Sequence, residues 1–187
     1  MNSTEQELID RLIDLSFAED IGAGDHTTLS CIPATAMGKS KLLIKEAGVL
    51  AGIEIAKEVF RRFDPEMQVE VFIEDGTEVK PGDVAMIVSG RVQSLLQTER
   101  LMLNIMQRMS GIATMTRTYA KRLEGTNTHV LDTRKTTPGM RILPTLDCRG
   151  PIASTSTKRI NTVHSTNTAS KPTPTQNNLL FFFSIIL

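Results

Sequence analysis

The chain has 187 residues, of which 40% are hydrophobic and 22% charged, a composition typical of one globular domain or of one domain with part of another. The 21 basic and 21 acidic side chains give a formal net charge of zero, which argues against a general nucleic-acid binder. Two cysteines, Cys31 and Cys148, are too few for a disulfide framework or a Cys-rich zinc site.

The charge is divided unevenly along the chain. Residues 1–143 hold 17 Lys/Arg and 20 Asp/Glu, a net of −3, whereas residues 144–187 hold 4 Lys/Arg and one acid, a net of +3. The second segment contains 13 Ser/Thr and no Glu, and it has no helical or strand periodicity before the final LLFFFSIIL. That apolar run is shorter than the roughly 20 residues of a membrane span, and the N-terminus lacks the features of a signal peptide. We therefore expect a cytoplasmic protein without a membrane segment, and a low-complexity, irregular tail.

Hydrophobic spacing predicts the elements of the first 143 residues. Ile55, Val59 and Phe63 recur at helical spacing, whereas Val69 and Val71 alternate with polar residues as in a strand. The order of the patterns favours an α+β fold that ends in the start of a βα alternation. The expected elements are a helix over 4–19, a loop over 20–25, a strand over 38–47, a helix over 52–63, strands over 69–73 and 84–88, a helix over 91–109, a break at Gly111, a second helix to about residue 124, and a short strand at 130–131.

The helix over 91–109 is apolar around most of its circumference, which predicts burial. Arg100, Asn104 and Arg108 nevertheless fall on one stripe of it, at i, i+4 and i+8. A buried, unpaired guanidinium is costly, so this stripe must meet counter-charges or an anionic ligand. A stripe that faces solvent, or an ion pair with Glu99 or another acid, is the alternative interpretation.

A second cationic set follows the strand predicted at 130–131. Asp132–Gly139 reads DTRKTTPG, in which Thr133, Arg134 and Lys135 directly follow the strand end. Ligands of α/β folds lie at the carboxyl ends of strands, and Arg, Lys and hydroxyl groups together bind carboxylates and phosphates. Two cationic sets imply a substrate with several negative charges. An exposed basic loop is the alternative.

Other patterns carry less chemistry. The three histidines lack the spacing of metal ligands, and there is no dinucleotide-binding or phosphate-binding glycine motif. The stretch EDGTEVKPGDV at 74–84 resembles a turn of lipoyl and biotinyl carrier modules. No lysine stands where a carrier would need one, so a structural turn at Pro81-Gly82-Asp83 is the interpretation that we favour.

Three motifs together resemble one known family. EDIGAGDHTT, ERLMLNIMQRMSGIAT and LDTRKTTPGMR match, in order and spacing, those of quinolinate phosphoribosyltransferase, also called carboxylating nicotinate-nucleotide pyrophosphorylase, over about residues 5–143. The resemblance implies an N-terminal α/β sandwich domain over 1–110, the beginning of an open α/β barrel over 111–143, and an aberrant tail over 144–187. It also implies the conversion of quinolinate and phosphoribosyl pyrophosphate to nicotinate mononucleotide, pyrophosphate and CO2 in de novo NAD biosynthesis.

The resemblance assigns roles to four residues. Arg100 would contact quinolinate in the site of the partner subunit of a homodimer or larger oligomer. Thr133, Arg134 and Lys135 would hold quinolinate from within the barrel, and Lys135 is also the expected catalytic residue. Mg²⁺ is the usual cofactor of the family, and its ligands belong to the part of the barrel for which this sequence has no matching motif.

The tail is where the sequence departs from the family pattern. A G-G-G-x-N-H-R motif and further barrel strands should follow Leu143, and residues 144–187 contain no such motif. A frameshift or an equivalent truncation near Leu143 is therefore our hypothesis, and we expect the 187-residue chain to be poorly stable and inactive. A related phosphoribosyltransferase-like protein, such as a molybdenum-transport-associated homologue, and a non-catalytic dimerisation or carrier-like module are the alternatives.

Overall fold

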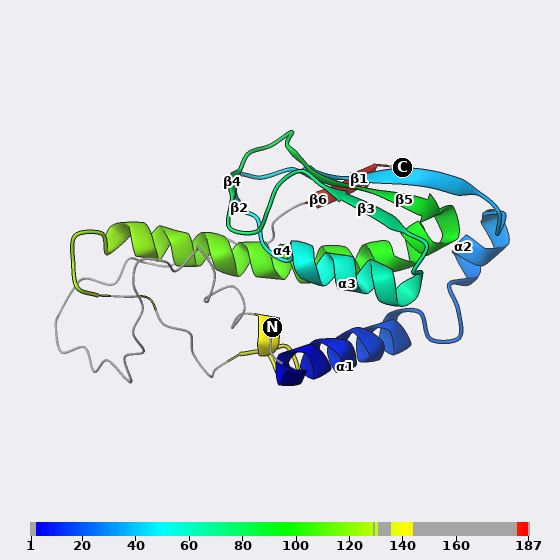
Figure 1. The fold of residues 1–187 in the computed structure, drawn as a ribbon, viewed down its shortest axis with the longest axis horizontal. Helices are drawn as coiled ribbons and strands as arrows, with labels where there is room; N and C mark the ends of the chain where they lie inside the picture. The colour runs from blue at the N-terminus through cyan, green and yellow to red at the C-terminus, as the bar shows by residue number, and fades with distance from the viewer. Residues whose placement is uncertain (1–2, 129, 131–135, 144–182, 187) are drawn as a thin grey trace.

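The computed structural model describes residues 3–128, 130, 136–143 and 183–186. Figure 1 shows three layers: a curved sheet, a helical layer formed by α3 and α4, and helix α1 on the far side of that layer. The elements are α1 (Ser3–Asp20), α2 (His26–Cys31), β1 (Met37–Ile44), β2 (Gly48–Val49), α3 (Ile53–Phe63), β3 (Gln68–Val71), β4 (Glu78–Val79), β5 (Val84–Arg91), α4 (Val92–Arg122) and β6 (Phe183–Ile186). The expected α+β fold is thereby confirmed.

The main sheet is antiparallel, with the strand order β3-β5-β1-β6. Strand β1 pairs with β5 from Met37 opposite Arg91 to Leu43 opposite Val84. Alternate β1 side chains are buried, among them Leu42 and Ile44, because one face of the sheet covers the helices. Strands β2 and β4 form a separate two-stranded sheet.

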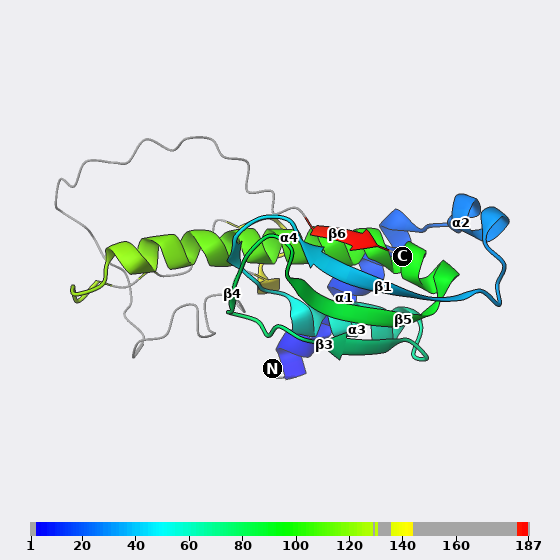
Figure 2. The ribbon, with the colours of Figure 1, turned by 90° about the horizontal axis from the view of Figure 1, so that it is seen from above.

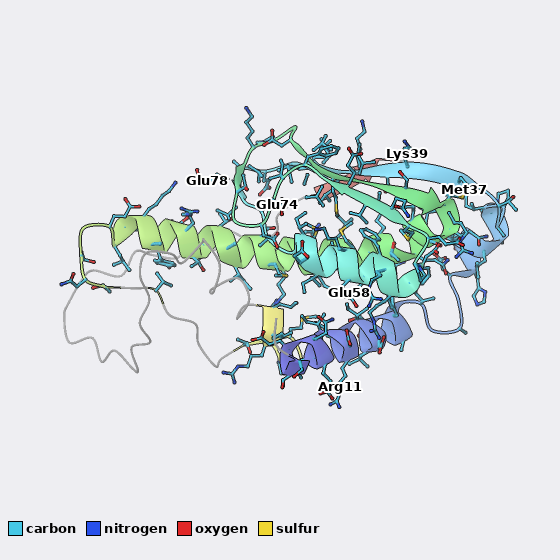
Figure 3. All side chains as sticks on the ribbon, viewed as in Figure 1. Arg11, Met37, Lys39, Glu58, Glu74 and Glu78 are labelled. Atoms are coloured by element: carbon cyan, nitrogen blue, oxygen red, sulfur yellow. The ribbon has the colours of Figure 1, made fainter. Side chains whose placement is uncertain are left out.

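The amphipathic pattern of α3 is confirmed. Ile55 and Val59 are buried in the core, and Phe63 packs against Phe17 of α1 with ring centroids 5.2 Å apart. Helix α3 therefore lies between the sheet and α1 (Figure 1). Figure 3 shows Arg11 on the outer face of α1, away from α3, where it forms an exposed ion pair with Glu7 at 2.6 Å.

The start of α3 depends on two residues far apart in sequence. Gly52 has a left-handed φ of +105°, and a Cβ atom there would lie 3.2 Å from the Met109 sulfur. Glycine is therefore favoured at this position by both conformation and space. Because Gly52 has no side chain to cap the helix, the Asp75 carboxylate does so by accepting a hydrogen bond from the Ile53 N–H at 2.9 Å. Burial raises the pKa of Asp75.

The predicted helix break at Gly111 is wrong, because α4 is one helix of 31 residues. Two side chains in the middle of α4, Ser110 and Thr114, hydrogen-bond to the backbone of β2 and of the residues that follow it. The Ser110 hydroxyl accepts from the Ala51 N–H at 3.0 Å and donates to the Ala51 carbonyl at 3.1 Å, and Thr114 accepts from the Val49 N–H at 2.8 Å. These contacts offset the roughly 1 kcal/mol that a glycine costs inside a helix.

Two further differences concern short elements. Helix α2 was not predicted; Asp25 caps it by accepting hydrogen bonds from the Thr28 N–H at 3.1 Å and the Thr28 hydroxyl at 2.6 Å. The tail was expected to be irregular, but Phe183–Ile186 form β6, which pairs with β1 from Lys41 opposite Ile186 to Ile44 opposite Phe183. An apolar, β-branched stretch readily adds to an unpaired strand edge.

A buried carboxylate joins the end of α3 to the start of α4. The Asp64 side chain, 1% exposed, accepts hydrogen bonds from Arg91 Nε at 2.9 Å, from the Ser94 hydroxyl at 2.6 Å and from the Glu66 N–H at 3.2 Å. The Arg91 guanidinium and the Ser94 hydroxyl hold its pKa below the usual value, although burial opposes them. We call Asp64, Arg91 and Ser94 the Asp64 cluster.

Candidate substrate-binding residues on α4

The polar stripe of α4 lies on the helix face opposite its core contacts. Met102 and Met106 are completely buried, whereas Arg100 and Asn104 are exposed and Arg108 is partly buried. Helix α4 is therefore buried on one side only, whereas its apolar composition predicted burial around most of its circumference. Figure 2 shows that one end of α4 lies under the sheet near α2 while the other end projects beyond β2 and β4.

Arg100 pairs with an acid at the end of α1. Its Nη1 lies 3.0 Å from Asp20 Oδ1, with 67% of the arginine side chain and 24% of the aspartate side chain exposed. The alternative interpretation of the stripe, an ion pair with an acid, thus holds for Arg100, and the acid is Asp20 rather than its neighbour Glu99. With 67% of its side chain exposed, Arg100 stays accessible to a further anion.

The charge of Arg100 also affects the pKa of a second acid, Asp25. The hydroxyl and N–H of Thr28 hold the pKa of Asp25 below its usual value, and the Arg100 guanidinium adds a smaller contribution. Arg100 therefore pairs with Asp20 at the end of α1 and also lowers the pKa of Asp25 in the connection to α2. This part of the EDIGAGDHTT motif meets the motif of α4 in space.

Arg108 contacts the other predicted site. Its Nη2 donates a hydrogen bond to the Thr137 hydroxyl, which belongs to the DTRKTTPG segment. The chain then turns, with the Met140 N–H bonded to the Thr137 carbonyl at 3.1 Å, and enters the core at Leu143, which is completely buried. The polar stripe of α4 is thus linked at Arg100 to the α1–α2 connection and at Arg108 to the segment that follows Lys135.

Three of the four predicted site residues, Thr133, Arg134 and Lys135, lie outside the described residues, as do Leu131 and Asp132. Of the four, Arg100 alone has a described position. Its role toward quinolinate and that of the three others stay predictions from the resemblance.

The carrier-like turn has a structural role. The Asp83 carboxylate accepts a hydrogen bond from the Lys80 N–H at 2.9 Å, and Gly82, at a φ of +95°, donates its N–H to the Ile44 carbonyl at 2.9 Å. The predicted turn at Pro81-Gly82-Asp83 is confirmed, and it connects β4 to β5.

Metal ligands do not cluster in the part of the chain that the structure describes: no group of three or more His, Cys, Asp or Glu side chains there could hold a metal ion. Within the same residues, no helix is long and apolar enough to cross a membrane.

Asp20 was not among the predicted site residues, because loop chemistry sufficed to explain an acid before glycines. One signal was available. Negative charge at the C-terminal end of a helix is opposed by the helix dipole, so Asp20, directly after the helix expected over 4–19, indicates a cationic partner elsewhere.

Two family models match consecutive parts of the chain. Residues 25–110 match the N-terminal domain of quinolinate phosphoribosyl transferase, and residues 112–162 match its C-terminal domain. The second match runs past Leu143, so family-like sequence extends further than the motifs indicated.

Individual relatives agree with these matches. The chain is 40% identical over 136 residues to a probable nicotinate-nucleotide pyrophosphorylase [carboxylating] of Synechocystis, covering 73% of this chain and 46% of the relative. It is 41% identical over 133 residues to the chloroplastic enzyme of that name in rice, covering 71% and 35%. The solved structure of NadC from Streptococcus pyogenes superposes with a TM-score of 0.75 at 35% identity, covering 82% of this chain and 54% of that one.

The fold and the matches therefore define the N-terminal domain of a phosphoribosyltransferase joined to the beginning of a second domain. The chain belongs to the quinolinate phosphoribosyltransferase family. It spans about half the length, or less, of the curated relatives that it matches.

Proposed function

We propose that the chain carries part of the quinolinate site of a quinolinate phosphoribosyltransferase. The reaction would convert quinolinate and phosphoribosyl pyrophosphate to nicotinate mononucleotide, pyrophosphate and CO2. The observation that carries the proposal is the consecutive match of both domain models across residues 25–162, with Arg100 exposed on α4 inside the matched region.

The chemistry of the four residues suits a dicarboxylate. Quinolinate bears two carboxylates, and the planar forks of Arg100 and Arg134 can each bind one through two N–H groups. The Thr133 hydroxyl would add a hydrogen bond. Lys135 would contribute a point charge near the reacting centre, as the proposed catalytic residue. Catalysis would then consist mainly of positioning and of electrostatic stabilisation as pyrophosphate leaves an oxocarbenium-like ribose.

The remaining features of the proposal rest on the family resemblance. They are a homodimer or larger homo-oligomer in which Arg100 reaches the partner's site, a cytoplasmic location, and Mg²⁺ as cofactor. The roles assigned to these four residues contain no step through Mg²⁺.

Calorimetric titration of quinolinate tests the binding function. The 187-residue chain is expected to bind quinolinate, and Arg134→Ala and Arg100→Ala are each expected to weaken binding at least tenfold, which corresponds to about 1.4 kcal/mol. Lys80→Ala, a cation on the β4–β5 turn, is the matched control and should leave the affinity unchanged. Equal affinities of the wild type and Arg134→Ala would show that the TRK segment forms no quinolinate site.

A separate assay tests catalysis. A polypeptide of this sequence is expected to form no nicotinate mononucleotide, because it contains no G-G-G-x-N-H-R motif to hold the phosphoribosyl substrate. Measurable product would contradict the expectation that catalysis needs that motif, while leaving the binding proposal intact.

A further inference from the structure

The position of Asp20 is not explained by the stability of its own helix. Asp20 is the last residue of α1, whose final turn contains no basic residue, and the negative end of the helix dipole disfavours a carboxylate there. The ion pair that the structure gives Asp20 is the one with Arg100, 80 positions away in sequence, at 3.0 Å. The ion pair with Arg100, and not a contribution to the stability of α1, therefore explains the position of this carboxylate.

The backbone that carries Asp20 is fixed relative to α4. The Ile21 N–H bonds to the Phe17 carbonyl at 3.0 Å and the Gly24 N–H bonds to the Ile21 carbonyl at 2.8 Å, so the chain after α1 turns tightly. Beyond α2, the Gln93 side chain donates to the Ile32 carbonyl at 2.7 Å, and the Val92 N–H bonds to Ala36 at 2.8 Å. The segment that follows Asp20 is therefore held by a tight turn at one end and by contacts with the start of α4 at the other.

The contact occupies only part of the guanidinium. Asp20 Oδ1 lies 3.0 Å from Nη1, whereas 67% of the Arg100 side chain remains exposed. A guanidinium is planar, so an ion pair at Nη1 restricts the directions that the Nε–Nη2 edge can take. That edge is the one that can bind a carboxylate through two parallel hydrogen bonds.

We propose that Asp20 is a positioning residue for substrate binding: by holding Nη1 of Arg100, it orients the Nε–Nη2 edge of the guanidinium toward a carboxylate of the dicarboxylate substrate. This inference rests on the proposed function. Its energetic basis is the conformational freedom that a long, exposed side chain otherwise loses on binding, roughly 0.5–1.5 kcal/mol for each such side chain.

The proposal is tested by titrating quinolinate into two Asp20 variants, into a Glu19 control and into variants in the Arg100→Ala background. Asp20→Ala is expected to weaken binding roughly three- to tenfold, the equivalent of ordering one side chain. Asp20→Asn keeps the shape of the side chain but removes the charge of the ion pair, and is expected to weaken binding by a similar factor. Glu19→Ala removes the same charge from the same turn at an exposed position and should leave the affinity unchanged. In the Arg100→Ala background, Asp20→Ala should cause no further loss.

The possible results separate this inference from the function on which it rests. Tighter binding in both Asp20 variants would show that Asp20 competes with the substrate, and an unchanged affinity of Asp20→Ala would show that it has no role; either result overturns the inference alone. A loss that persists in the Arg100→Ala background would reveal a general structural effect and overturn it as well. Failure of the wild-type chain to bind quinolinate would overturn the proposed function together with the inference.

Discussion

Two Asp–Arg pairs of nearly equal length differ in what surrounds them. Arg91 Nε lies 2.9 Å from Asp64 Oδ2, and Arg100 Nη1 lies 3.0 Å from Asp20 Oδ1. The Asp64 side chain is 1% exposed and accepts further hydrogen bonds from Ser94 and the backbone, whereas 24% of Asp20 is exposed. The first pair joins the end of α3 to the start of α4, while the second leaves 67% of its arginine side chain exposed.

The difference shows how the same two side chains serve stability in one place and are available for binding in the other. A buried carboxylate that loses its donors is left without solvation, so the surrounding structure depends on the pair. An exposed pair contributes little to folding, so its cation can add a second anionic partner at small cost.

Removing each carboxylate should give the largest contrast. Asp64→Ala is expected to lower the free energy of unfolding by about 2 kcal/mol, because it leaves the buried Ser94 hydroxyl without its acceptor and removes a charge-assisted hydrogen bond from the half-exposed Arg91. Asp20→Ala is expected to cost less than about 1 kcal/mol. Urea unfolding followed by circular dichroism measures both values. Similar losses in the two variants would mean that the pairs do not differ as their burial indicates.

Acidification should sharpen the contrast between buried carboxylates. The pKa of Asp64 is lowered in the folded state, so its contribution is complete above the unfolded-state pKa and is lost as the pH falls through the folded-state pKa. Asp64→Asn is therefore expected to make the loss of stability in acid shallower.

Asp75 should behave in the opposite way in the same measurement. Its pKa is raised by burial, so its contribution is present below the unfolded-state pKa and lost as the pH rises through the folded-state pKa. Asp75→Asn should make the loss in acid steeper. Urea unfolding between pH 3 and pH 7 distinguishes the two variants, and slopes that change in the same direction would contradict the assigned causes.

The smallest expected effect is the electrostatic influence of Arg100 on Asp25. Arg100→Ala should raise the pKa of Asp25 slightly, and Thr28→Val should raise it more, because the Thr28 hydroxyl has the larger influence. Carboxyl-detected NMR titration measures both shifts. A larger shift of the Asp25 pKa in Arg100→Ala than in Thr28→Val would contradict the larger influence of the Thr28 hydroxyl.

Local patterns predicted those parts of the fold that depend on neighbours in sequence. The spacing of Ile55 and Val59 located α3, and Pro81-Gly82-Asp83 located its turn. The continuity of α4 could not be predicted, because the groups that support it at Ser110 come from Ala51, 59 positions earlier. The six-residue helix α2 is too short to show a periodic pattern.

The candidate site shows the same limit. The stripe that contains Arg100 could be predicted from spacing alone, but its ion-pair partner could not, because Asp20 reaches it through the packing of α1 and α2 near α4. Thr133, Arg134 and Lys135 rest on a local motif and its resemblance to a family. Their arrangement around quinolinate stays a prediction.

The continuous helix α4 has a mechanical consequence. The matches to the two family domains meet at Gly111, in the middle of a helix that is about 46 Å long at 1.5 Å per residue. The two domains are thus joined by a continuous helix rather than by a flexible linker. Each residue inserted into α4 would rotate the following residues by about 100° about the helix axis and advance them by about 1.5 Å. The length of α4 therefore sets both the angle and the distance between the domains.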